Sequence, residues 1–398
     1  MAICGTRPEA VKLHSIIAAL RRRQQRTIVI STGQHKDLTP RMLAEFGLAP
    51  DMELSLQGAD TEPAQLLGVM LLRLAPVLRA YRPALILVQG DTLSALAGAL
   101  AGAYAGIPVV HVEAGLRTGS LQEPFPEEMQ RCLITPVAAL HFAPTARAAE
   151  MLRREGVPAE RIHITGNSGI DALQRSYLRV QVDAELQQRM RTRFPFCAAD
   201  DRQLVLMTIH RRENIGDRMT DIAAAVRTLA AEDAVEIILP LHPNPAVRQP
   251  LLGQLAHVPH VSLVEPLDHA EMVWLMQRAS LLLTDSGGLQ EEAPSFGLRT
   301  LVLRRLTERM EAVDAGIARL STLAQDEIIA AARELLRLPR PSPCQPFGDG
   351  RAGERIAGHI TGWLAAQAEG VKLQTPPAIA SVAENPESWL QLAPGHPA

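Results

Sequence analysis

The stretch Ser280–Glu292, SLLLTDSGGLQEE, decides the fold, because it joins an apolar run of strand length to the start of a helix. Between them lies a Ser-Gly-Gly turn, where backbone amides can approach a diphosphate closely and Ser286 adds a hydroxyl. The alternative is an ordinary structural glycine turn. Strand, turn and helix form the repeating unit of parallel α/β proteins, so we predict that fold class, with anion-binding loops after its strands.

The same alternation continues on both sides of this stretch and divides the chain into two halves of similar size. A Gly166-Asn167 turn separates them, so we expect one domain over 1–166 and a second over 167–355. We expect a helix over 356–368 to cross back to the first domain, and a mobile tail over 369–398. The expected strands are Ala2–Cys4, Thr27–Ser31, Ala84–Gln89, Val109–Val112, Ala139–Ala143, Arg161–Thr165, Leu204–Thr208, Ala234–Pro240, Val261–Val264, Ser280–Thr284 and Thr300–Leu303. The expected helices include Pro8–Leu20, Pro63–Ala80, Thr92–Ala105, Asp183–Arg193, Asp217–Ala231, Ala270–Gln277, Leu289–Ser295 and Gln325–Leu336.

Composition limits the partners of this 398-residue chain. Its formal net charge is −3 and its aromatic content is 3%, which argues against nucleic acid and against an anionic membrane as partners. The longest uncharged stretch divides into a helix and a strand, so we expect no transmembrane helix. Glu9 and Lys12 precede any apolar run that would form a signal peptide, and the four cysteines are scattered. We expect reduced thiols and a cytoplasmic protein.

A second anion-binding loop is expected within Cys4–Lys12, CGTRPEAVK. Gly5 allows a sharp turn after a strand, and Thr6 can cap the helix that follows. The helix start offers free amides, Arg7 can bind a phosphate or carboxylate through two bonds, and Lys12 lies about one turn further on. The alternative is a capped turn with a solvated arginine.

Three carboxylates stand at the loops that follow strands of the first half. Asp91 and Glu113 each follow an apolar strand, where a carboxylate is costly to bury unless it is paired or used. Glu127 stands at the proline-led helix start of PFPEEMQR. Each has a structural alternative: a helix cap for Asp91, an ion pair for Glu113, and a favourable helix dipole for Glu127.

The second half adds His210, in the run HRREN after a strand. It is either a structural cap or an acid–base group and phosphate contact, and the two adjacent arginines favour anion binding. Glu292, one turn beyond the Ser-Gly-Gly turn, can accept both hydroxyls of a ribose. No GxGxxG follows any of the expected strands, and the sequence has no P-loop, DxD, HExxH or GxSxG pattern, so it indicates neither a dinucleotide fingerprint nor a metal site.

Taken together, eight segments between Gly5 and about Ile356 resemble the non-hydrolysing UDP-N-acetylglucosamine 2-epimerases. They are GTRPEAVK, QGDTLSALA, HVEAGLRTG, PFPEEMQR, HFAPT, HRREN, TDSGGLQEEAPSFG and TERMEAV. The resemblance implies two Rossmann-like domains in a GT-B-like arrangement, with the substrate in an interdomain cleft. It also implies reversible conversion of UDP-N-acetylglucosamine to UDP-N-acetylmannosamine through 2-acetamidoglucal, without a cofactor. The implied enzyme is a cytoplasmic homodimer that supplies surface-polysaccharide synthesis.

The resemblance also implies residue roles. The catalytic candidates are Asp91, Glu113, Glu127 and His210, with acid and base not assigned among the carboxylates. The substrate-binding candidates are Arg7, Lys12, Arg131, Met272, Ser286, Gly287, Gly288, Glu292 and Arg309. Some members of the family bind a second UDP-N-acetylglucosamine as an activator, and the corresponding candidates are Gln34, His35, Gln65 and His242.

Several positions depart from the family pattern. Thr135-Pro136 interrupts a stretch that is usually helical, and Arg305-Leu306 replaces Asp-Thr near the uridine. Three alternatives remain open, and these departures motivate the last of them. The chain can be a hydrolysing relative that releases N-acetylmannosamine and UDP, a GT-B glycosyltransferase, or a catalytically silent UDP-sugar-binding protein.

Overall fold

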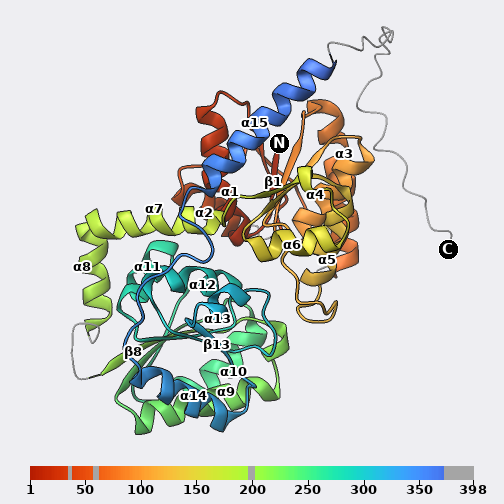
Figure 1. Ribbon diagram of the computed structural model, residues 1–398. Helices are drawn as coiled ribbons and strands as arrows, with labels where there is room; N and C mark the ends of the chain where they lie inside the picture. The colour runs from red at the N-terminus through yellow and green to blue at the C-terminus, as the bar shows by residue number, and fades with distance from the viewer. Residues whose placement is uncertain (35–37, 57–61, 196–201, 372–398) are drawn as a thin grey trace, which may run out of the picture.

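The computed structural model describes residues 1–34, 38–56, 62–195 and 202–371 as two parallel β-sheets with helices packed on them (Figure 1). The first sheet has the strand order β3-β2-β1-β4-β5-β6-β7, and the second has the order β10-β9-β8-β11-β12-β13. Because all the pairings are parallel, the carboxyl ends of the strands in each sheet share one edge. The predicted α/β class with two Rossmann-like sheets is confirmed.

The strands are short and mostly buried, as expected of sheets covered on both faces. In the first half they are β1 (Ala2–Cys4), β2 (Val29–Ser31), β3 (Met52–Glu53), β4 (Ile86–Gln89), β5 (Val109–Val112), β6 (Ala138–Ala143) and β7 (Ile162–Ile164). In the second half they are β8 (Gln203–Thr208), β9 (Val235–Pro240), β10 (Val261–Val264), β11 (Leu281–Thr284), β12 (Thr300–Val302) and β13 (Ala318–Leu320).

The main helices of the first half are α1 (Arg7–Arg22), α2 (Leu38–Glu45), α3 (Pro63–Tyr81), α4 (Leu93–Tyr104), α5 (Glu127–Ile134) and α6 (Ala146–Arg154). Next come α7 (Ser168–Val182) and α8 (Ala184–Arg193), and the second half continues with α9 (Asp217–Glu232), α10 (Pro245–Leu255), α11 (His269–Arg278), α12 (Gly287–Glu292), α13 (Met310–Asp314) and α14 (Gln325–Arg337). The last helix is α15 (Ala352–Val371). The predicted tail 369–398 therefore begins inside α15, and 372–398 lie outside the described residues.

Two connections run side by side between the halves. The backbone N–H of Asn167, just before α7, donates to the carbonyl of Phe347 at 2.8 Å, and Gly348 packs closely on Gly166. Beyond the second connection, α15 returns to the first half and lies along α1 (Figure 1), where Ile356 and Ile360 join its buried core. The predicted domain boundaries remain a prediction.

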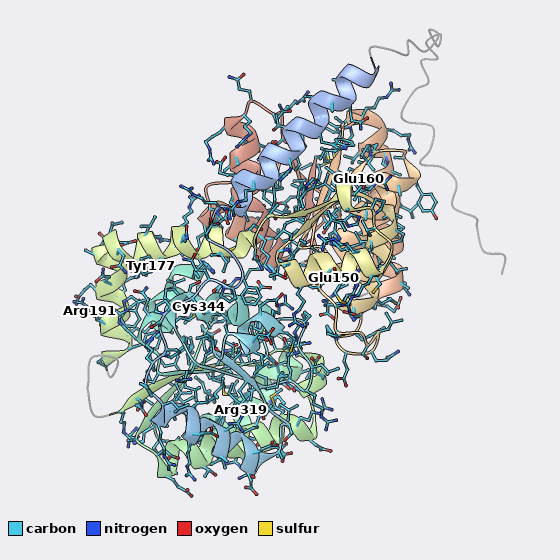
Figure 2. The ribbon with its side chains drawn as sticks, in the orientation of Figure 1. Glu150, Glu160, Tyr177, Arg191, Arg319 and Cys344 are labelled. Atoms are coloured by element: carbon cyan, nitrogen blue, oxygen red, sulfur yellow. The ribbon has the colours of Figure 1, made fainter. Side chains whose placement is uncertain are left out.

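α7 packs on both halves. Its Ala172 belongs to the apolar core around α1, whereas Ile170 and Leu173 belong to the core around α11. Tyr177, labelled in Figure 2, marks its course along the second half. A single helix thus contributes to both cores, so the position of one half relative to the other depends on α7.

The differences from the predicted elements are small and local. The strands β3 and β13 were not predicted, since they have only two and three residues. The helix expected at Leu289–Ser295 begins earlier, at Gly287, and tightens into a 3-10 turn at Ala293–Phe296. Pro136 acts as predicted: α5 ends at Ile134, and Thr135–Val137 forms a 3-10 turn.

One described helix, α3, is long and apolar enough to cross a membrane by length and composition alone. It packs on α4 through Met70, Leu74 and Leu78, but only 17% of its apolar window is buried. Leu72 is 75% exposed and Tyr81 is 44% exposed. A surface helix of a globular protein passes the same test, so the observation is weak evidence for a membrane span.

Candidate active site

The centre of the candidate site is a buried group of four charged side chains, which we call the inner cluster: Lys12, Glu113, Glu291 and Arg309. Lys12 Nζ contacts Glu113 Oε1 at 2.7 Å and Glu291 Oε2 at 2.9 Å. Arg309 Nε lies 3.0 Å from Glu291 Oε1, and its Nη2 lies 3.4 Å from Glu113 Oε1. The strand-end carboxylate of the first half is thus joined directly to the helix that follows the Ser-Gly-Gly turn of the second.

Burial and neighbouring charges set the protonation of the inner cluster. Burial raises the pKa of Glu113 to about 7, although Lys12 and Arg309 act against the shift. Burial acts in the same direction on Glu291, but Lys12 and Arg309 outweigh it and lower its pKa. Burial alone would lower the pKa of Lys12, yet Glu113 and Glu291 raise it. Glu113 is therefore able to hold or release a proton near neutral pH.

The backbone holds Glu113 in an unusual conformation. Its φ is +62°, in the left-handed region, where a non-glycine residue is under strain. Gln89, at the end of β4, donates a side-chain hydrogen bond to Glu113 Oε2. The strain and this bond aim the carboxylate at Lys12 and Arg309.

Asp91 and Glu127, the other carboxylate candidates, lie nearer the surface. Asp91 Oδ2 pairs with Arg131 Nη2 at 2.9 Å, and Glu127 Oε1 accepts from Arg211 Nη1 at 2.9 Å. The two carboxylate side chains are 27% and 30% exposed. Arg131, predicted to bind substrate, holds Asp91 in this structure and lies 3.7 Å from Glu308 of the second half.

His210 sits at the end of β8, beside a buried carboxylate. Its Nδ1 lies 3.0 Å from Asp285 Oδ1, and Asp285 also accepts the backbone N–H groups of His210 and Arg211. Burial opposes ionisation of Asp285, but His210 and these donors outweigh it and hold the pKa at about 2. A fixed negative charge therefore orients the imidazole through one nitrogen and leaves the other available.

The glycine turn has no room for a side chain at Gly287 unless Arg309 moves, whereas a Cβ on Gly288 would meet nothing nearer than 4.0 Å. A Cβ on Gly287 would meet the guanidinium carbon of Arg309 at 2.5 Å, and Gly288 follows it in the first turn of α12. The amide of Ser286 donates to Thr284 Oγ1 at 2.9 Å, which fixes the turn on the end of β11. The predicted turn and the predicted Arg309 are thus in direct contact.

Three other predicted binding residues lie at the boundary or in the core of the second half. Arg7 Nη2 donates to the carbonyl of Leu267 across the boundary at 3.1 Å. Glu292 Oε1 pairs with His269 Nε2 at 3.1 Å. Met272 is buried in the apolar core around α11, so its side chain packs inside the second half.

The residues predicted for a second nucleotide sugar are separated into different contacts. Gln34 Oε1 accepts from the amide and hydroxyl of Ser94, Gln65 is exposed at the start of α3, and the His242 ring stacks on His210 with 5.7 Å between centroids. His35 lies outside the described residues. The second site remains a prediction.

Several buried charged residues of the site were not predicted: Glu9, Asp285, Glu291, Arg304 and Glu308. Asp285 follows a strand, so the rule that selected Asp91 and Glu113 would have found it. Glu308 pairs with Arg304 at 3.1 Å and also contacts Arg309. In the parts of the chain that the structure describes, no three His, Cys, Asp or Glu side chains gather as a metal site.

Carboxylates at the strand ends of one Rossmann-like sheet thus meet a glycine turn and basic groups of a second, which defines a GT-B-like class of α/β protein. Residues 18–361 match the family described as UDP-N-acetylglucosamine 2-epimerase. The probable UDP-N-acetylglucosamine 2-epimerase of Ralstonia nicotianae is 40% identical over 372 residues, which cover 92% of this chain and 99% of the relative. The Salmonella typhimurium UDP-N-acetylglucosamine 2-epimerase is 40% identical over 89% of this chain and 96% of its own.

Solved structures agree with these relatives. The Neisseria meningitidis UDP-GlcNAc 2-epimerase bound to UDP-GlcNAc has a TM-score of 0.88 and 35% identity, covering 91% of this chain and 99% of that one. The Methanocaldococcus jannaschii enzyme in complex with UDP-GlcNAc and UDP has a TM-score of 0.83 and 31% identity, covering 90% and 98%. The chain belongs to the UDP-N-acetylglucosamine 2-epimerase family.

Proposed function

We propose that the protein interconverts UDP-N-acetylglucosamine and UDP-N-acetylmannosamine reversibly, without hydrolysis. The observation that carries this proposal is the inner cluster, which joins a carboxylate of near-neutral pKa to the glycine turn of the other half. Relatives of known structure were solved with UDP-GlcNAc or UDP bound. The nucleotide sugar is therefore proposed to bind where the two halves meet.

The proposed chemistry is an elimination followed by re-addition. The C2 proton of the sugar is not acidic, so direct removal and return of that proton is difficult. Loss of UDP together with the C2 proton gives 2-acetamidoglucal, and UDP then adds back while the proton returns to the opposite face. This requires a base and an acid on the two sides of C2, for which Asp91, Glu113 and Glu127 are the candidates.

The two halves together supply groups suited to the departing diphosphate. Arg7, His210, Arg309, the Ser286 hydroxyl and the amides of Gly287 and Gly288 are proposed to stabilise its charge as the bond to the sugar breaks. Lys12 has its ammonium shared between two carboxylates, so we propose that it keeps Glu113 and Glu291 in place as much as it binds UDP. Contact between the halves is proposed to exclude water, which would otherwise trap the intermediate.

The test is an exchange assay with purified protein and UDP-N-acetylglucosamine in heavy water. Deuterium at C2, together with reversible formation of UDP-N-acetylmannosamine in the NMR spectrum, is the expected result. Accumulation of free N-acetylmannosamine and UDP would instead identify a hydrolysing enzyme. Binding of the nucleotide sugar without deuterium at C2 would identify a catalytically silent binding protein.

We further propose that the protein is a homodimer in the cytoplasm that supplies surface-polysaccharide synthesis. The helix α3 supports self-association, because only 17% of its apolar window is buried and Leu72 on it is 75% exposed, and exposed apolar surface marks contact sites. Light scattering should give about twice the mass of the chain. The variant Leu72→Asp should lower that mass, and a monomeric wild-type protein would contradict the proposal.

A further inference from the structure

Three buried polar side chains form a line through the second half. Ser176 Oγ on α7 lies 2.8 Å from His269 Nδ1, at the first position of α11. His269 Nε2 lies 3.1 Å from Glu292 Oε1, at the end of α12. The three residues are 4%, 6% and 7% exposed. Each helix therefore contributes one member of a single hydrogen-bonded chain.

The line ends on an oxygen that has no protein partner. Glu292 Oε2 is buried and makes no hydrogen bond to any described residue. A buried carboxylate oxygen without a donor is costly, since it has lost its water without replacement. His269, the partner of Glu292, also lies 6.1 Å from the ring of Phe46 of the first half, so this end of the line is close to the boundary between the halves. A donor from a ligand would satisfy the free oxygen.

The geometry fixes the direction in which the line acts. His269 Nε2 faces a carboxylate, so this nitrogen carries the hydrogen, and in the neutral ring Nδ1 then accepts from the Ser176 hydroxyl. A Ser-His-carboxylate sequence also occurs in nucleophilic catalysis. Ser176, however, lies in the middle of a 15-residue helix, where the neighbouring amides bond within the helix and offer no donors for an oxyanion. The serine is the anchored end and Glu292 is the end available to a ligand.

The other face of His269 is supported by the first half. The Phe46 ring lies 6.1 Å from the His269 ring, and His14 on α1 stacks on Phe46 with 4.1 Å between the ring centroids. The imidazole is therefore held by packing as well as by hydrogen bonds. A group held in this way keeps the Glu292 carboxylate in one orientation before any ligand arrives.

We propose that His269, held by Ser176, is a positioning residue that fixes Glu292 to accept the 2′- and 3′-hydroxyls of a ribonucleotide. His269 occupies one lone pair of Oε1, which leaves the second lone pair and the whole of Oε2 for two hydroxyl donors. The consequence is selection of a ribonucleotide over its 2′-deoxy form. The inference rests on the proposed function only in taking UDP as the nucleotide.

Calorimetric titration of the full-length protein with UDP and with 2′-deoxy-UDP tests the proposal. The wild type should bind UDP about 10- to 100-fold more tightly, the effect of one hydrogen bond to a buried charge. His269→Phe keeps the ring that packs on Phe46 but removes the donor, so this preference should fall below about 3-fold. The matched control His14→Phe alters a buried histidine of the same stack and should keep the wild-type preference.

Ser176→Ala provides a second, milder test if His269→Phe does not fold. It should reduce the preference for UDP by about 3-fold, because His269 loses its anchor but keeps its bond to Glu292. An unchanged ratio in both variants, or an equal loss in His14→Phe, would overturn the proposal. A wild type that binds both nucleotides equally would overturn it too, while leaving intact the epimerase activity seen in heavy water. A wild type that binds neither nucleotide would overturn the proposed function as well.

Discussion

The ion pairs between the two halves fall into an inner and an outer set. In the inner cluster, each charged side chain is at most 8% exposed. At the outer edge, Arg147 pairs with Asp314 at 2.5 Å, with side chains 50% and 56% exposed. Both sets join the same two halves. They differ in their exposure to solvent, and that difference decides how strongly the charges of each set interact.

Low exposure makes the inner charges interdependent. Removing water strengthens each attraction, but it also makes any unpaired charge expensive, so the inner residues must be present together. The exposed pair is screened by water and contributes little. Asp91 and Glu127, at 27% and 30% exposure, lie between these extremes. The comparison predicts that variants of the inner cluster lose stability and activity together. Variants of more exposed site residues should lose activity while stability changes little.

The largest effect is expected for Glu113→Gln. Loss of this carboxylate leaves Lys12 and Arg309 with excess positive charge in a buried place, so the free energy of unfolding should fall by about 3 kcal/mol. Deuterium exchange at C2 should also fall by about 10²- to 10⁴-fold if Glu113 transfers a proton. Chemical denaturation and the heavy-water assay measure the two effects.

The matched control is Glu150→Gln on α6 (Figure 2), where the carboxylate is 47% exposed and contacts two arginines of its own helix. Its stability should change by less than about 0.5 kcal/mol. Equal losses of stability in the two variants would show that burial does not separate the inner and outer charges.

Asp91→Asn should separate activity from stability. Exchange at C2 should again fall by about 10²- to 10⁴-fold, but the unfolding free energy should change by less than about 1 kcal/mol, because the pair with Arg131 is partly open to water. UDP affinity should also stay within about 1 kcal/mol, since a group used in the transition state adds little to ground-state binding. Near-normal turnover would remove Asp91 from the proposed mechanism.

Glu9 shows what burial does to a carboxylate that has only neutral donors. It accepts from the amides of Gly5 and Thr6 and from the hydroxyls of Thr6 and Thr92, and burial raises its pKa from 4.5 to about 7. The folded state thus keeps a proton that the unfolded state releases. The stability due to this proton is complete below about pH 4.5 and is lost as the pH rises to about 7.

The variant Glu9→Gln tests this pH dependence, because glutamine does not titrate. The difference in unfolding free energy between wild type and variant should shift against the wild type by at most about 3 kcal/mol from pH 4.5 to 7. It should be constant above that range. Denaturation curves at a series of pH values measure the shift, and a flat difference throughout would contradict it.

The smallest effect is expected at the outer edge. Arg147→Gln breaks the exposed pair with Asp314, so the unfolding free energy should change by less than about 0.5 kcal/mol and exchange at C2 should stay within about 2-fold of wild type. The same assays apply. A loss approaching that of Glu113→Gln would mean that contact between the halves depends on the outer pair as much as on the inner cluster.

Much of the fold could be predicted because buried parallel strands are short apolar runs between helical patterns. The prediction of Val109–Val112 matches β5 to the residue. β3, Met52–Glu53, has only two residues, which is too short to show any period, and its pairing depends on the neighbouring β2. The sequence also does not show which half α7 packs on, because the helix contributes apolar residues to two cores.

The positions of the candidate residues at strand ends and turns could be predicted from the sequence, but the pairings between them could not. Strand-end position selected Asp91 and Glu113, and the glycine turn selected Gly287. The sequence does not show which cation approaches which acid, so the pairing of Arg131 with Asp91 was not predicted. Substrate binding by Arg131 remains a prediction. Glu291 was not predicted. It lies on a helix, and the sequence does not show that its side chain points inward to Lys12.

The paired connections between the halves have a practical consequence. The first half is not one continuous length of chain, since the core around α1 is completed by Ile356 and Ile360 from the far end of the sequence. A fragment that stops at 166 would leave that apolar surface uncovered and should aggregate unless residues 352–371 are joined to it. Any swing of one half against the other must also bend both connections at once, close to the point where Gly348 packs on Gly166.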